Sequence, residues 1–131
     1  MMYGYFMAGG LGMLALRLAL AAIFIVHGLP KIQKPEGMAT AMKWSKTQVQ
    51  VLGIAELVGG LAVGTGIAMS LGALVLAAVM VGAIYYKTQV WKTPFTAHDK
   101  MGWEFDLILL AAALAVWSSS GWGWGMMGRW Y

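Results

Sequence analysis

The stretch LGMLALRLALAAIFIVHGL, residues 11–29, is apolar throughout except for Arg17 and His27. A helix needs about 20 mostly apolar residues to cross the hydrocarbon core of a bilayer. Backbone groups in lipid must be hydrogen-bonded within the segment, which makes a helix the form that can span it. The stretch therefore predicts a membrane-spanning helix.

Three further apolar runs follow, at residues 49–69, 70–86 and 103–118. The whole chain of 131 residues is 60% hydrophobic and 11% charged, whereas soluble domains carry about 25% charged residues. A chain of this size cannot hide so much apolar surface inside one water-exposed globule. The sequence predicts an all-α fold, an integral membrane four-helix bundle formed by a single domain over residues 1–131.

The basic residues predict the orientation of this bundle. The loops at residues 30–48 and 87–102 contain Lys31, Lys34, Lys43, Lys46, Lys87, Lys92 and Lys100, whereas the opposite side has only Arg129. Because basic loops stay in the cytoplasm, we expect both lysine loops to be cytoplasmic and both termini to lie outside the cell membrane.

The tryptophans agree with two membrane interfaces. Trp44, Trp91 and Trp103 lie near the lysine loops, and Trp117, Trp122, Trp124 and Trp130 lie near the other end. Such aromatic belts are typical of membrane proteins. The segment MATAMKWSK, residues 38–46, predicts a short interfacial helix with Met38, Met42 and Trp44 facing lipid.

Ionisable residues within the spans are costly and should face the bundle and pair with one another. The candidates for such an intramembrane polar cluster, a ligand or proton site, are Arg17, His27, Lys31, Glu56 and Glu104. Glu56 has two sets of possible partners at this point, Arg17 on one side and His27 or Lys31 on the other. The cluster is either a salt-bridge network that fixes helix register or a polar pocket for a quinone headgroup, a proton or a small polar ligand.

Two acids open the fourth span, in the sequence GWEFD. Glu104 and Asp106 are two residues apart and so point about 200° from each other on a helix. We expect Glu104 to face inward toward His27 and Glu56. Asp106 is then expected at the interface or as a cap that complements the dipole of the first helical turn.

Glycines recur in the second span, and Gly60 and Gly64 form a small-xxx-small step. Such steps let two helices approach closely. We interpret them as packing residues.

The chain resembles the DoxX-like family of small four-helix membrane proteins. The resemblance runs through LRLALAAIFIVHGLPKI, GIAELVGGLAVGTG, VMVGAIYY and MGWEFDLILLAAALAV, between residues 14 and 116. It implies a subunit linked to quinone-dependent oxidation, whose polar core comprises Arg17, His27, Lys31, Glu56 and Glu104.

Three functions are consistent with these features. The first is a non-catalytic accessory subunit of a larger membrane-bound redox complex, with the bilayer and other membrane subunits as partners. The second is a quinone-interacting subunit with a pocket among Arg17, His27, Glu56 and Glu104, and the third is a small transporter or ligand-binding protein.

The sequence disfavours several cofactor classes. The chain has no cysteine, which excludes thiolate metal ligands and covalently attached haem. A b-type haem needs two opposed histidines, but His98 lies in a loop. We expect no metal site and no nucleic-acid partner, and the possible non-covalent ligands are quinone or lipid.

Overall fold

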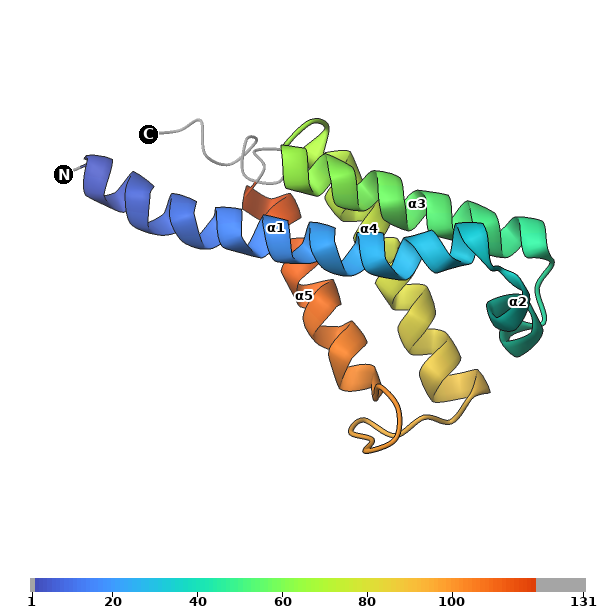
Figure 1. Cartoon of the computed structure of the whole chain (residues 1–131). Coiled ribbons are helices and arrows are strands. Elements are labelled where there is room, and N and C mark those ends of the chain that lie inside the picture. Colours follow the sequence, from blue (N-terminus) through green and yellow to red (C-terminus); the bar gives the residue numbers. More distant parts are fainter. Residues whose placement is uncertain (1, 120–131) are drawn as a thin grey trace.

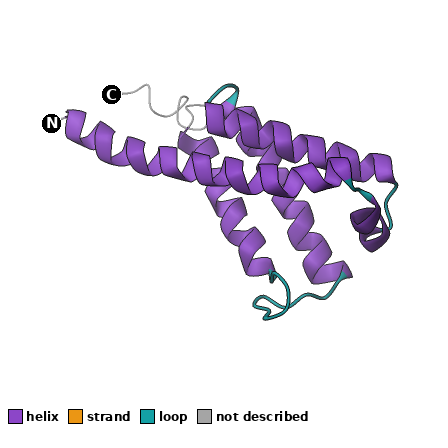
Figure 2. Ribbon diagram, viewed as in Figure 1, coloured by secondary structure: helices purple, strands orange, loops and turns teal. Residues whose placement is uncertain are grey.

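The computed structural model describes residues 2–119, with side chains from Gly10 onward, and every regular element in this range is helical (Figure 2). The elements are α1 (Met2–Gln33), α2 (Glu36–Met42), α3 (Lys46–Thr65), α4 (Met69–Tyr85), the π-helical turn η1 (Tyr86–Val90) and α5 (Trp103–Ser119). The predicted all-α fold is confirmed.

Three helical segments of the described chain are long and apolar enough to cross a membrane: Gly10–Gln33, Lys46–Thr65 and Met69–Val90. They correspond to the first three predicted spans. The fourth, α5, has 17 residues, which is the lower limit of the range that can cross a bilayer.

The helices form two pairs. α1 lies beside α3, and α4 lies beside α5; the second pair is inclined to the first and diverges from it toward one end (Figure 1). At that end Trp44 Nε1 donates a 2.6 Å hydrogen bond to Tyr86 Oη, and Trp91 Nε1 donates a 3.1 Å bond to the Ala41 carbonyl. The segments 34–45 and 86–102 therefore share one end of the molecule, called the lysine-loop end below.

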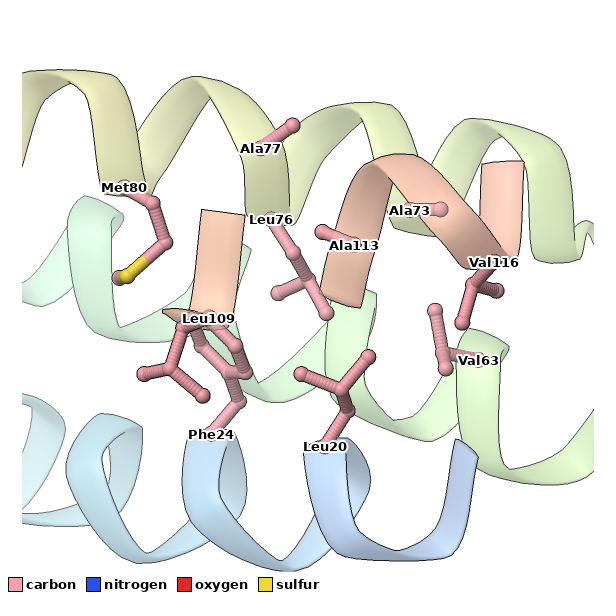
Figure 3. Packing of buried hydrophobic residues seen from close by; sticks show 10 residues of the cluster. All are labelled: Leu20, Phe24, Val63, Ala73, Leu76, Ala77, Met80, Leu109, Ala113 and Val116. Carbon is pink, nitrogen blue, oxygen red and sulfur yellow. The ribbon is translucent and has the colours of Figure 1, made fainter. Parts of the chain in front are cut away.

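The hydrophobic core fills the region where all four long helices meet. Its buried residues are Leu20 and Phe24 of α1, Val63 of α3, Ala73, Leu76, Ala77 and Met80 of α4, and Leu109, Ala113 and Val116 of α5 (Figure 3). Outward-facing side chains are also apolar: Val26 is 66% exposed and Ile108 is 63% exposed. An apolar exterior around an apolar core is the pattern expected of helices that face lipid.

Glycines allow α1 and α3 to touch along their length. A Cβ atom on Gly53 would lie 2.7 Å from the Gly28 carbonyl oxygen, and one on Gly64 would lie 2.8 Å from Ala21 Cβ. The predicted close approach at Gly60 and Gly64 is confirmed, since Gly60 also faces α1. The Gly28–Gly53 contact is the tightest of these and brings the next turn of α1 against the next turn of α3.

Local sequence sets the ends of α3. Ser45 and Gln48 form a reciprocal capping box, with bonds of 3.1 and 3.0 Å, so the helix begins at Lys46, before the predicted residue 49. The helix ends at Thr65, earlier than the predicted residue 69. The reason is that Gly66 adopts the left-handed conformation (φ 84°) that terminates helices.

Candidate functional site

A cavity of about 490 Å³ lies at the lysine-loop end, lined by residues of both helix pairs. Most of its wall is apolar or aromatic, with Phe24, Met42, Trp44, Tyr86 and Phe105 among the lining residues. Its polar residues come from α1, α3, η1 and α5, and are His27, Lys31, Glu56, Lys87 and Asp106. A largely apolar pocket of this size with a few convergent polar groups is typical of a small-molecule site.

Lys31 and Glu56 form a buried ion pair on one side of the cavity. Lys31 Nζ lies 2.6 Å from Glu56 Oε1, and the two side chains are 14% and 3% exposed. The pair is possible because the Gly28–Gly53 contact brings the two backbones together: a Cβ atom on Gly53 would lie 2.8 Å from Lys31 Cβ. Of the partners considered for Glu56, the structure selects Lys31.

A second ion pair joins η1 to α5. Lys87 Nζ lies 2.7 Å from Asp106 Oδ2, with the side chains 16% and 7% exposed. Asp106 shares the buried face of α5 with Leu109, Ala113 and Val116. The π-helical turn changes the helical register at Tyr86–Val90 and so presents Lys87 to this face.

His27 lies near both pairs in the cavity wall. Its Nδ1 is 2.7 Å from the Ile23 carbonyl oxygen, one turn earlier in α1. Its ring is 5.8 Å from the ring of Phe105, measured between centroids. The structure thus brings together His27, Lys31 and Glu56, three of the five predicted cluster residues.

Arg17 does not belong to this group. Its Nε donates a 2.8 Å bond to the Val63 carbonyl, and its Nη2 donates a 3.2 Å bond to the Gly64 carbonyl. These are among the carbonyls left unpaired at the end of α3, where a cation also complements the helix dipole. The predicted pocket that included Arg17 is corrected here, because Arg17 lies about 15 Å from His27 along α1.

The prediction that Glu104 faces inward is wrong. Glu104 is exposed, and its Oε2 accepts a 3.0 Å bond from Thr96 Oγ1 in the loop before α5. The two acids do point to opposite faces as expected, but their roles are exchanged. Asp106 is the buried one, and Glu104 occupies the first-turn position outside the cavity.

A short helix does form in this loop as α2 (Glu36–Met42), so it begins before the predicted residue 38 and ends before Trp44. Met38, Met42 and Trp44 line the cavity. The Trp44–Tyr86 bond holds this segment across the opening between the helix pairs, which explains why these apolar side chains turn inward.

Sequence reasoning missed Lys87, which it used only to set orientation. The predicted span ended at residue 86, whereas the π-helical turn η1 extends the helical segment to Val90 and includes Lys87, so no signal in the sequence would pair Lys87 with Asp106. The predicted belt residues Trp122, Trp124 and Trp130, with Arg129, fall outside the described residues. Within residues 2–119 no group of three potential metal ligands is present.

Comparison with known proteins decides the family. The DoxX family model matches residues 12–98, which is more than half of the chain. The chain belongs to the DoxX family. The match includes Lys31, Glu56 and Lys87 but stops before α5, so it does not reach Asp106.

A curated relative of this DoxX protein is "Putative oxidoreductase CatD" of Bacillus subtilis (strain 168). The two are 33% identical over 107 residues, which cover 79% of this chain and 75% of the relative. No solved structure matches the chain. The family and the apolar helices identify an all-helical membrane protein with weak similarity to a protein named as an oxidoreductase.

Proposed function

We propose that this DoxX protein binds the headgroup of a quinone-class molecule in its cavity and acts as a membrane subunit of a redox complex. The observation that carries the proposal is the cavity of about 490 Å³, which has aromatic and methionine walls and two ion pairs beside His27. A flat ring with polar substituents suits apolar walls combined with a few charged groups.

The route into the cavity supports a lipid-soluble ligand. Ala78 and Gly82 line the cavity and are also exposed, one turn apart on α4. Both lie within the candidate span Met69–Val90. A molecule dissolved in the bilayer can therefore reach the cavity past two small side chains.

The name of the curated relative favours a redox role over transport. A purely accessory subunit, the first of the three functions considered, has no need of a lined cavity with buried charges, because buried ion pairs add little stability compared with apolar packing. Membership of a complex and ligand binding are compatible. If the protein belongs to a redox complex, we expect it to co-migrate with oxidoreductase subunits after mild solubilisation of the membrane.

The orientation is part of this proposal. All four long helices cross the plasma membrane, with the lysine-loop end in the cytoplasm and both termini outside. Lys43 and Lys92 are exposed at the lysine-loop end. Both are expected to react with a membrane-impermeant amine reagent only after the cells are opened. Labelling of either residue in intact cells would reverse the orientation.

Ligand binding is testable with purified protein in lipid nanodiscs. Saturable 1:1 binding of decylubiquinone or of its quinol is expected by titration calorimetry. Gly82→Phe is expected to weaken this binding at least tenfold, because Gly82 lines the cavity and the added ring would obstruct it, while the first side-chain atom has open space around it.

Gly12→Phe is the matched control. Gly12 is also an exposed helical glycine with open space around it, but it does not line the cavity. It is expected to bind as the wild type does. Absence of saturable binding in the wild type, or equal binding by Gly82→Phe, would refute the proposed site.

A further inference from the structure

Glu56 carries a hydrogen-bond acceptor that no residue in the described range 2–119 uses. The residue is 2% exposed and lines the cavity. Lys31 donates to Oε1 at 2.6 Å, whereas Oε2 is buried and has no hydrogen-bond partner among the described residues. A buried carboxylate oxygen is costly unless it accepts a hydrogen bond, so this atom favours a ligand that donates one.

His27 supplies a second acceptor in the same wall. The Ile23 carbonyl can only accept, so the 2.7 Å contact requires that His27 Nδ1 carries the proton and donates it. In the neutral ring Nε2 then has a free lone pair and no proton. Both Glu56 and His27 therefore offer acceptors to a ligand in the cavity.

These acceptors discriminate between the two redox forms of a quinone-class ligand. A quinone carbonyl only accepts, so it can pair with Lys31 or Lys87 but leaves Glu56 Oε2 without a partner. A quinol hydroxyl can donate to Glu56 Oε2 and at the same time accept from a remaining N–H of Lys31. Sites that bind a ligand hydroxyl in this way reject analogues that lack it.

From this juxtaposition we infer that the cavity selects the reduced, hydroxylic form, a quinol or another aromatic diol, over the oxidised quinone. The inference rests on the proposed function and adds the redox state of the ligand to it. One hydroxyl of the diol donates to Glu56 Oε2 and the other to His27 Nε2, and the apolar remainder of the ring packs toward Phe24 and Phe105, which line the same cavity.

The experiment compares the affinities of three ligands of similar size for the wild-type protein in nanodiscs under anaerobic conditions. They are decylubiquinol, decylubiquinone and the dimethyl ether of the quinol, which keeps the ring but cannot donate. The quinol is expected to bind at least tenfold more tightly than either of the others, the cost of leaving one buried carboxylate oxygen unpaired.

Variants locate the source of the preference. Glu56→Gln is expected to reduce the quinol-to-quinone ratio of affinities to within threefold, because an amide can donate to a carbonyl. His27→Phe retains a ring beside Phe105 without an acceptor and is expected to lower quinol affinity more than quinone affinity. Glu104→Gln is the control, since Glu104 lies outside the cavity, and it should keep the wild-type ratio.

The outcomes separate the inference from the proposed function. Equal or tighter binding of quinone by the wild type would overturn the inference and leave the proposed site intact. Binding of none of the three ligands would refute both. Wild-type selectivity in folded Glu56→Gln and His27→Phe proteins would show that other groups discriminate, and would also overturn the inference.

Discussion

Gly53→Leu is expected to lower the free energy of unfolding by about 3 kcal/mol, the upper part of the range for overpacked helix contacts. The first side-chain atom would lie 2.7 Å from the Gly28 carbonyl oxygen and 2.8 Å from Lys31 Cβ. Backbone cannot yield as a flexible side chain does, so α1 and α3 must separate. Leucine favours a helix over glycine by less than about 1 kcal/mol. The steric clash is larger, so the substitution is expected to lower the free energy of unfolding.

The same substitution should also open the Lys31–Glu56 pair, because that pair lies beside the contact. Reversible unfolding in mixed micelles with increasing dodecyl sulfate measures the stability, and the calorimetric assay measures loss of ligand binding. Gly12→Leu, at an exposed glycine with open space around it, is expected to be neutral or slightly stabilising. An equal effect of the two substitutions would contradict the close approach of α1 and α3.

Asp106→Ala is expected to cost about 2–3 kcal/mol, because it leaves Lys87 without its carboxylate in a largely buried position. This loss of stability is smaller than the loss expected for a fully buried ion pair, because the Lys87 side chain is 16% exposed and a lysine can extend toward the membrane interface. Glu104→Ala is expected to change the stability by less than about 0.5 kcal/mol, as usual for an exposed position.

A double-mutant cycle with Lys87→Ala provides the check. If the ion pair is responsible, the double variant should be more stable than the sum of the single effects predicts, with a coupling of about 1 kcal/mol or more. Additive effects, or a Glu104→Ala effect as large as that of Asp106→Ala, would show that the wrong acid has been placed inside.

The sequence predicted the parts of this fold that follow from solvent. Long apolar runs require helices in lipid. Two lysine-rich loops on the same side of a membrane must be separated by an even number of membrane-spanning helices, and the sequence predicted two. The Trp44–Tyr86 and Trp91–Ala41 bonds confirm that these loops meet at one end. A close helix approach at Gly60 and Gly64 was also predicted, because small residues allow it, whereas the structure identified α1 as the neighbouring helix.

The sequence could not predict which face of each helix is inside. In water, an apolar stripe marks the core side of a helix. In α5, Ile108 on the exposed side and Leu109 on the buried side are both apolar, because lipid and protein interior favour the same residues. The choice between Glu104 and Asp106 therefore had no periodic signal to support it.

By itself, then, the sequence determined an all-helical membrane chain and the presence of ionisable residues within its spans. Only the tertiary structure decided how those charges are divided. Arg17 caps α3, Lys31 pairs with Glu56 across the Gly28–Gly53 contact, and Lys87 reaches Asp106 from a π-helical turn. The physical reason is that ion pairing depends on the rotation of each helix and on the divergence of the two helix pairs. The hydrophobic pattern of the sequence indicates neither of these, because the helices are apolar on all faces.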